Sequence, residues 1–290
     1  MKKEGKVIGR RRFLKQLSLA SLAGVGIGKG LEAVFAGKSE VDRVALALSQ
    51  AKKQGHKGLV IIGDYHNGNG TNYVQFMDEL NSQVPIDKIF MEGVYDGTQP
   101  GNDPYIQAMA DSFRADAQEL TPQEIAAHRR EDPQGYFRLK KSFEVEGIED
   151  PDLYMNALTL SSLEPAFYQW TSTRDPKELK KVIEMHESLK TKDFDLNLRS
   201  DLSFEETQKI GETLKRKQWE SVVRDRNVHC SSVINQALEQ NQTGALIIGS
   251  AHYDPEVQKR PEGQAPDILQ SQFDSDIKYS VTDIGRIQKG

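Results

Sequence analysis

The sequence predicts an α/β fold with a mainly parallel central sheet flanked by helices, and with a helical insertion or cap. Continuous aliphatic runs such as Leu59–Gly63 and Ala245–Gly249 are typical of strands buried on both faces. Stretches with helical periodicity separate these runs, so that strand, helix and strand follow one another closely. This alternation is typical of parallel sheets, because a parallel connection needs a crossover helix.

The expected elements follow from these patterns in chain order. They are a helix over 41–54, strands over 59–63 and 88–93 with a helix over 72–82 between them, a strand over 143–148, helices within 153–240, and strands over 245–249 and 278–282. Thr121-Pro122, Asp175-Pro176 and Ser203 mark helix starts. The segment of about 153–220, which is highly charged over about 175–220, is expected to form the helical insertion of a single domain over 37–290.

The first 36 residues are set apart as an export signal. Gly9–Lys15 resembles the twin-arginine pattern R-R-x-F-L-K, a short apolar stretch follows, and Val34–Ala36 fits a small-residue cleavage site. The protein is therefore expected to engage the twin-arginine export machinery and to reside in the periplasm or outside the cell. A basic amphipathic helix and a retained anchor are the alternatives, although the apolar stretch is short for a membrane span.

Removing this signal makes the remaining chain strongly acidic. The signal holds eight Lys or Arg and two Asp or Glu, so the formal charge changes from −5 to −11. An acidic surface repels phosphate backbones and anionic lipids. We therefore expect a small-molecule or peptide substrate, no nucleic-acid partner and no stable membrane span in the mature chain. A single cysteine, Cys230, excludes an intramolecular disulfide.

Two Gly-x-x-His motifs, Gly63–His66 and Gly249–His252, follow two of the expected strands. Ligands of parallel sheets bind beyond the carboxyl ends of the strands. We therefore expect His66, His252 and Glu92, which ends another strand, to form one site. The glycine that opens each motif is expected to permit a sharp turn with the backbone close to a ligand.

The helix expected over 219–238 carries an arginine on its apolar face. Apolar residues at three- and four-residue spacing form this face, with Arg226 in its middle and Arg224 well off it. A buried arginine needs an anionic partner, because an unpaired buried charge is costly. Two interpretations stay open: a salt bridge with a core carboxylate, or a guanidinium that pairs with Glu92 or stabilises an oxyanion. Cys230 is expected in the core, and His229 at the margin of the face.

The ordered set of motifs resembles the Tiki/TraB superfamily, which includes erythromycin-esterase-like and ChaN-like haem-binding branches. The matching residues are Gly63–His66, Met91–Gly93, Asp225–Asn227 and Gly249–His252, over roughly residues 58–255. Asp225–Asn227 resembles the family's (Glu/Asp)-Arg-(Asn/Asp) helix motif. The resemblance implies a catalytic or ligand-binding cluster of His66, Glu92, Arg226 and His252, and it leaves the reaction open.

A hydrolase is the first interpretation of this cluster. His66, Glu92 and His252 would hold a divalent metal ion with an open water position. Alternatively, His66 would act as a general base oriented by Glu92, with Arg226 stabilising the oxyanion. Asp64 would be a further ligand or a helix cap.

Haem or iron binding is the second interpretation. Tyr65 or Tyr253, each beside a motif histidine, would supply a phenolate ligand. Packing at the sheet edge is the simpler role for both tyrosines. A scaffold that has lost its activity is a third possibility, against which the presence of all four motif positions argues.

Overall fold

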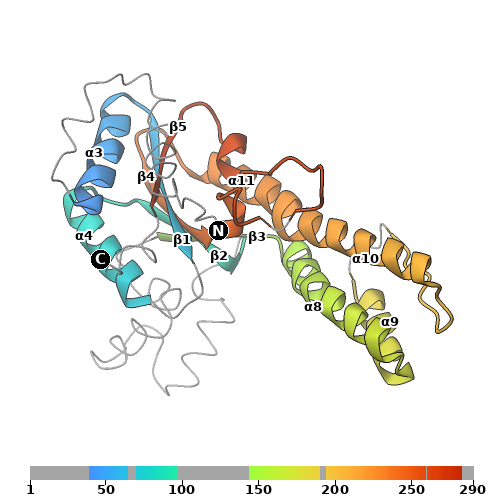
Figure 1. Cartoon of the computed structure of the whole chain (residues 1–290). Coiled ribbons are helices and arrows are strands. Elements are labelled where there is room, and N and C mark those ends of the chain that lie inside the picture. Colours follow the sequence, from blue (N-terminus) through green and yellow to red (C-terminus); the bar gives the residue numbers. More distant parts are fainter. Residues whose placement is uncertain (1–38, 65–69, 97–143, 190–193, 259, 283–290) are drawn as a thin grey trace, which may run out of the picture.

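The computed structural model describes residues 39–64, 70–96, 144–189, 194–258 and 260–282. A five-stranded parallel sheet with helices on both faces confirms the α/β prediction (Figure 1). Among these residues no helix combines the length and the apolar character that crossing a membrane requires. The helix start expected at Thr121-Pro122 lies outside the described residues, as does the segment 97–143 around it.

All expected strands form, with bounds that differ by a few residues. They are β1 (Lys57–Asp64), β2 (Lys88–Tyr95), β3 (Glu144–Glu149), β4 (Thr243–Gly249) and β5 (Ile277–Thr282). Their order in the sheet is β3-β2-β4-β1-β5. The strand β4 therefore lies between β2 and β1. The second Gly-x-x-His motif, at the end of β4, thus lies between the strand of Glu92 and the strand of the first motif.

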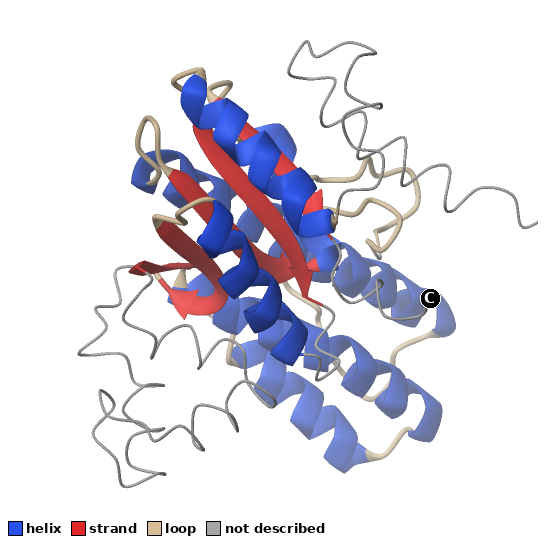
Figure 2. Cartoon of the chain, turned by 90° about the vertical axis from the view of Figure 1, so that its left-hand side faces the viewer, coloured by secondary structure: helices blue, strands red, loops and turns tan. Residues whose placement is uncertain are grey.

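Each face of the sheet has its own apolar core, because alternate strand residues point to opposite faces. On one face α3 (Glu40–Lys53) and α4 (Gly70–Gln83) cover residues such as Val60 and Ile247. On the other face α11 (Arg226–Ala237) covers Ile61 and Leu246. Figure 2 looks onto the sheet from the side of α3 and α4, which lie in front of it.

The helices α8 (Pro151–Thr173), α9 (Pro176–Glu187) and α10 (Phe204–Trp219) form an extension that we call the arm. It projects away from the sheet (Figure 1) and has a separate apolar core that includes Phe167, Val182 and Leu214. Two of its helix starts agree with the sequence: Asp175 accepts from Lys177 N, and Ser203 forms a capping box with Glu206.

The helix expected over 219–238 is not continuously α-helical. A π-helical segment, η2 (Glu220–Asp225), separates α10 from α11 and ends immediately before Arg226. The expectation of one regular helix was therefore wrong at this point. Apolar spacing reports which face is buried, but a single wide turn changes that spacing too little to be recognised. Such turns are rare and are frequent at functional sites.

Candidate functional site

The carboxyl ends of four neighbouring strands supply the site. Glu149 ends β3, Glu92 lies near the end of β2, and Gly249 ends β4. On the other side of β4, Asp64 of β1 pairs with Gly249. The starts of both Gly-x-x-His motifs are thus direct neighbours in the sheet, which agrees with the expectation that the motifs share one edge.

A bulge in β2 places the Glu92 carboxylate over this edge. The β2–β3 register shifts between Met91 and Tyr95, and Gly93 has a φ of 79°, which side chains other than glycine rarely adopt. The Glu92 Oε2 atom accepts a hydrogen bond from Gly249 N on the adjacent strand. The N–H of Gly93 donates to Glu149 Oε1 at 3.4 Å, which ties the bulge to the end of β3.

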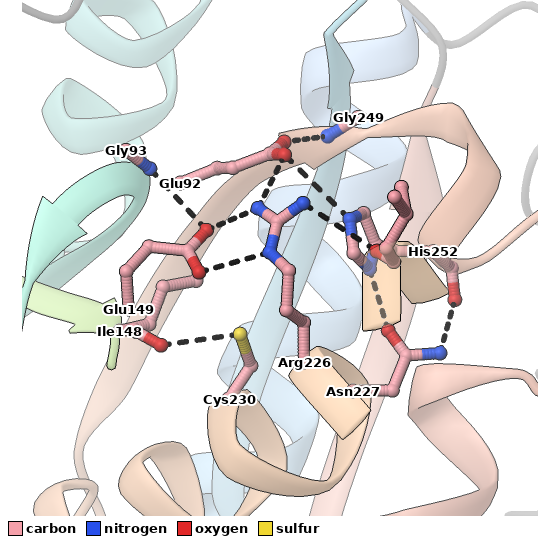
Figure 3. A network of polar contacts seen from close by, with 10 residues as sticks. Glu92, Gly93, Ile148, Glu149, Arg226, Asn227, Cys230, Gly249 and His252 are labelled. Atoms are coloured by element: carbon pink, nitrogen blue, oxygen red, sulfur yellow. Dashed lines mark hydrogen bonds and ion pairs between the residues drawn. The ribbon is translucent and has the colours of Figure 1, made fainter. Parts of the chain in front are cut away.

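Arg226 bridges two carboxylates in the interior of the protein (Figure 3). Its Nε donates to Glu149 Oε2 at 3.0 Å, and its Nη2 donates to Glu149 Oε1 and, at 2.7 Å, to Glu92 Oε1. The side chains of Arg226 and Glu149 are only 5% and 1% exposed. The ring of Tyr154 lies 5.3 Å from the guanidinium carbon. This geometry favours the salt-bridge interpretation of Arg226 over a role as oxyanion donor.

The π-helical segment contributes to the placement of Arg226. The Arg226 N–H donates to the carbonyl of Val223, and Arg226 Nη1 donates to the carbonyl of Val222 at 3.4 Å. In a regular α-helix the Arg226 N–H itself would take the Val222 carbonyl. At the end of this segment the Val222 carbonyl therefore accepts from the guanidinium rather than from the Arg226 N–H.

The two ring nitrogens of His252 face Asn227 and Glu92. The His252 Nδ1 atom is 2.6 Å from Asn227 Oδ1, and His252 Nε2 is 3.5 Å from Glu92 Oε1. The His252 side chain is 3% exposed. Because Asn227 Oδ1 can only accept, His252 Nδ1 carries a proton. Nε2 is then the ring nitrogen that faces the carboxylate.

The electrostatics of the site follow from this arrangement. Burial alone would raise the pKa of Glu92, but the contacts with His252 and Arg226 outweigh it and hold this pKa well below the usual value. Burial alone would lower the pKa of Arg226, and its hydrogen bonds to Glu149 and the charge of Glu92 raise it. Both groups are therefore charged at neutral pH, as is needed for the bridge.

A tight turn, η3 (Ser250–His252), follows Gly249 as expected, and both motif glycines also have a packing role. Neither has a positive φ among the described residues. A Cβ on Gly63 would lie 1.8 Å from the hydroxyl oxygen of Tyr253, and a Cβ on Gly249 would lie 3.1 Å from Glu92 Oε2. Each glycine therefore leaves space for a side chain of the site region. Tyr253 is 7% exposed and packs in the core against Gly63, as the simpler interpretation of this tyrosine expected.

The remaining expected residues divide into three groups. His66 and Tyr65 lie outside the described residues. Cys230 is buried in the core, as expected, and its Sγ donates to the carbonyl of Ile148; burial raises the pKa of its thiol. His229 is 26% exposed, in agreement with a place at the margin of the apolar face, and its Nε2 is 3.8 Å from Asp96 Oδ2.

The described donors do not fit a divalent cation between Glu92 and His252. The two Glu92 oxygens accept from Arg226 and from Gly249 N, so a metal ion there would face the guanidinium. Within the described ranges, no three His, Cys, Asp or Glu side chains form a group that could hold a metal ion. The expected third ligand, His66, lies outside these ranges.

Sequence reasoning missed two members of the site. Glu149 directly follows the strand expected over 143–148 and was given no role, yet it is the main partner of Arg226. Its position at a strand's carboxyl end, like that of Glu92, was the available signal. Asn227 was recognised only as the last residue of the Asp225–Asn227 motif. Its position next to Arg226 in the sequence gave no indication that its side chain would orient His252.

Comparisons with models of known protein families, with curated proteins and with solved structures find no match for this chain.

Proposed function

We propose that this chain is an exported hydrolase of the Tiki/TraB type, in which histidines at the carboxyl edge of the sheet activate water. The observation that carries the proposal is the His252 ring, which is held between Asn227 Oδ1 and Glu92 Oε1. A fixed imidazole beside a carboxylate is a suitable proton acceptor and donor near neutral pH. The superfamily that the motifs resemble includes erythromycin-esterase-like branches, with which this reaction class agrees.

In this proposal the two motif histidines divide the proton transfers. One imidazole takes a proton from water, and the other returns a proton to the leaving group. Arg226 does not touch the substrate; it keeps Glu92 ionised and in place through the shared contact with Glu149. Glu92 in turn orients His252. The roles of Glu92 and Arg226 are thus to build the site, and the proton transfer belongs to the histidines.

The proposed reaction does not use a metal ion. The support is the engagement of both Glu92 oxygens by Arg226 and Gly249 N, described above. Elemental analysis of the folded, exported protein tests this point. A stoichiometric divalent ion that is lost in both His66→Ala and His252→Ala would contradict it and restore the metal-dependent interpretation.

Haem or iron binding finds no supporting observation among the described residues. Tyr253 packs with its hydroxyl against Gly63 in the core, where a phenolate ligand would not reach an iron centre without repacking. A Soret band that forms on haem addition and is lost in Tyr253→Phe or Tyr65→Phe would favour this alternative over the hydrolase.

The decisive experiment is a substrate screen with the mature chain, residues 37–290. We expect hydrolysis within a panel of p-nitrophenyl esters and fluorogenic peptides, with kcat/KM lowered at least roughly 100-fold in His66→Ala and in His252→Ala. His56→Ala is the matched control, because His56 precedes β1 at the opposite edge of the sheet. Full activity in both motif variants would contradict the proposal.

Export is part of the same proposal and has its own test. A fusion of residues 1–36 to a reporter that is active only after folded export should be transported. Replacing Arg10 and Arg11 with lysines should prevent this transport. Transport that is unaffected by these replacements would contradict the twin-arginine route.

A further inference from the structure

We propose that Asp267 is a positioning residue that fixes the orientation of His252 through Asn227. Its catalytic consequence rests on the proposed hydrolase function, whereas its effect on the His252 ring does not. Asp267 lies between β4 and β5 in the chain, in a segment that carries none of the sequence motifs. The structure brings it to the amide nitrogen of Asn227, whose oxygen faces the His252 ring.

The amide of Asn227 connects the two residues. Asn227 Nδ2 donates to Asp267 Oδ1 at 2.9 Å, while Asn227 Oδ1 faces His252 Nδ1 at 2.6 Å. The same nitrogen is 3.3 Å from the carbonyls of His252 and Asp267. Asn227 is fully buried, so its amide has no water to compensate for a wrong orientation.

These contacts determine which way the amide points. A nitrogen surrounded by a carboxylate and two carbonyls is favourable, whereas the amide oxygen in that place would face three acceptors. The oxygen of Asn227 must therefore face His252. As an acceptor, it requires a proton on His252 Nδ1, and it leaves Nε2 toward Glu92.

Asp267 itself is held in place by other amides. Gln272 Nε2 donates to Asp267 Oδ1 at 2.8 Å, and Gln272 Oε1 accepts from Ser231 of α11 at 3.2 Å. Gln258 bonds the backbone of Asp267 on both sides, through its Nε2 to the carbonyl and through its Oε1 from the N–H. These contacts hold the Asp267 carboxylate against α11 in one orientation.

A charged acceptor strengthens the series of hydrogen bonds that ends at His252. Hydrogen bonds to ionised groups are stronger than neutral ones, and linked bonds polarise one another. The Asp267 carboxylate makes the Asn227 oxygen a better acceptor for His252 Nδ1. Partners of this kind, one step removed from the reacting group, alter activity by about 10- to 100-fold in metal sites, and we expect the lower end here.

The first test measures the His252 ring and needs no substrate. In ¹⁵N-labelled mature protein the His252 Nδ1 proton should give a slowly exchanging downfield resonance. Its exchange should be about tenfold faster in Asp267→Ala, which corresponds to a weakened hydrogen bond. Glu262→Ala is the matched control, since Glu262 is an exposed carboxylate of the same segment. Equal exchange in Asp267→Ala and Glu262→Ala would overturn the proposal.

An isosteric variant keeps the test valid if Asp267→Ala does not fold. Asp267→Asn retains an acceptor oxygen and removes the charge, so its exchange rate should lie between those of the wild type and Asp267→Ala. An exchange rate in Asp267→Asn equal to that of the wild type would show that the charge does not act on His252, and the proposal would be wrong.

The second test measures hydrolysis of whichever p-nitrophenyl ester the wild type cleaves. Asp267→Ala should lower kcat roughly tenfold with KM changed less than twofold, Asp267→Asn should recover part of kcat, and Glu262→Ala should match the wild type. Changed His252 exchange without hydrolysis by any variant would leave the positioning role intact and reject the hydrolase. Unchanged kcat in Asp267→Ala would reject the positioning role alone.

Discussion

The sheet edge and the arm use charged residues in opposite ways. In the arm, ion pairs such as Lys180–Glu184 and Lys209–Glu205 link exposed side chains one helical turn apart, each more than 60% exposed. At the sheet edge, Arg226 and Glu149 are buried and Glu92 is only 14% exposed, and the three side chains come from three separate elements. The first kind of pair adds little stability, because water screens it.

The unfavourable free energy of burying charged groups therefore arises at the sheet edge and not in the arm. Burying ions is unfavourable unless each finds its partner, and a buried bridge often stabilises no more than apolar residues of the same volume. Stability alone therefore gives little reason for the arrangement at the sheet edge. Function gives a reason, because the proposed reaction needs His252 and an ionised Glu92 beside it. Four comparisons between the two regions test this view, from the largest expected effect to the smallest.

The largest difference is expected between Arg226→Met and Arg199→Met. Removing Arg226 leaves Glu149 and Glu92 buried without their cation, which should lower the free energy of unfolding by about 3–5 kcal/mol. Removing Arg199, whose partner Glu206 is on the arm surface, should change it by less than about 1 kcal/mol. Urea unfolding of the mature chain measures both.

A triple variant sharpens this first comparison. Arg226→Met combined with Glu92→Gln and Glu149→Gln removes all three charges, so most of the lost stability should return while activity stays absent. A triple variant as unstable as Arg226→Met would show that packing, rather than charge, accounts for the loss.

Two glycines offer the second comparison. Gly63→Ala should lower stability by about 1–3 kcal/mol, because its Cβ would overlap the buried Tyr253 ring. In Gly211→Ala the nearest atom is the hydroxyl of Tyr168 at 2.9 Å, the tip of an exposed side chain that can move. Alanine also favours a helix over glycine by about 1 kcal/mol, so Gly211→Ala should be neutral or stabilising. Thermal unfolding checks both signs.

The third comparison uses acid. The pKa of Glu92 in the folded protein is held below its usual 4.5, so its stabilising contribution is complete above that pH and is lost as pH falls toward the folded value. Bonds from Ser203 and Arg199 lower the pKa of Glu206 in the arm to about 2. Both Glu92→Gln and Glu206→Gln should flatten the acid side of the stability profile. Added salt should weaken the part of the Glu206 effect that comes from the exposed Arg199 charge, and it should change the effect of Glu92, which is 14% exposed, much less.

The smallest effect is expected at the helix caps, where the two regions should agree. Ser39 of α3 and Ser203 of α10 form equivalent capping boxes on exposed helix ends. Each serine-to-alanine change should cost about 1 kcal/mol, measured by urea unfolding. A much larger loss at Ser203 than at Ser39 would mean that the arm depends on its caps more than the core does.

The sequence predicted the fold and part of the site because the relevant signals are local. Buried strands show as aliphatic runs, helix starts show as capping residues, and the phase of one helix identified Arg226 as buried and Arg224 as exposed. Parallel topology then places strand ends at one edge. That argument reached Glu92, Arg226 and His252, which the structure brings together.

Only the tertiary structure decided how these residues pair. Arg226 bonds to Glu149 and Glu92, which are 77 and 134 positions away, and no periodic pattern carries information over such separations. The insertion of β4 between β2 and β1, the π-helical turn before Arg226 and the bond from Asn227 to Asp267 depend on the packing of distant segments. The sequence by itself determined which edge of the sheet carries the chemistry. The tertiary structure decided which carboxylates and amides hold it, because buried polar groups choose partners by proximity in space.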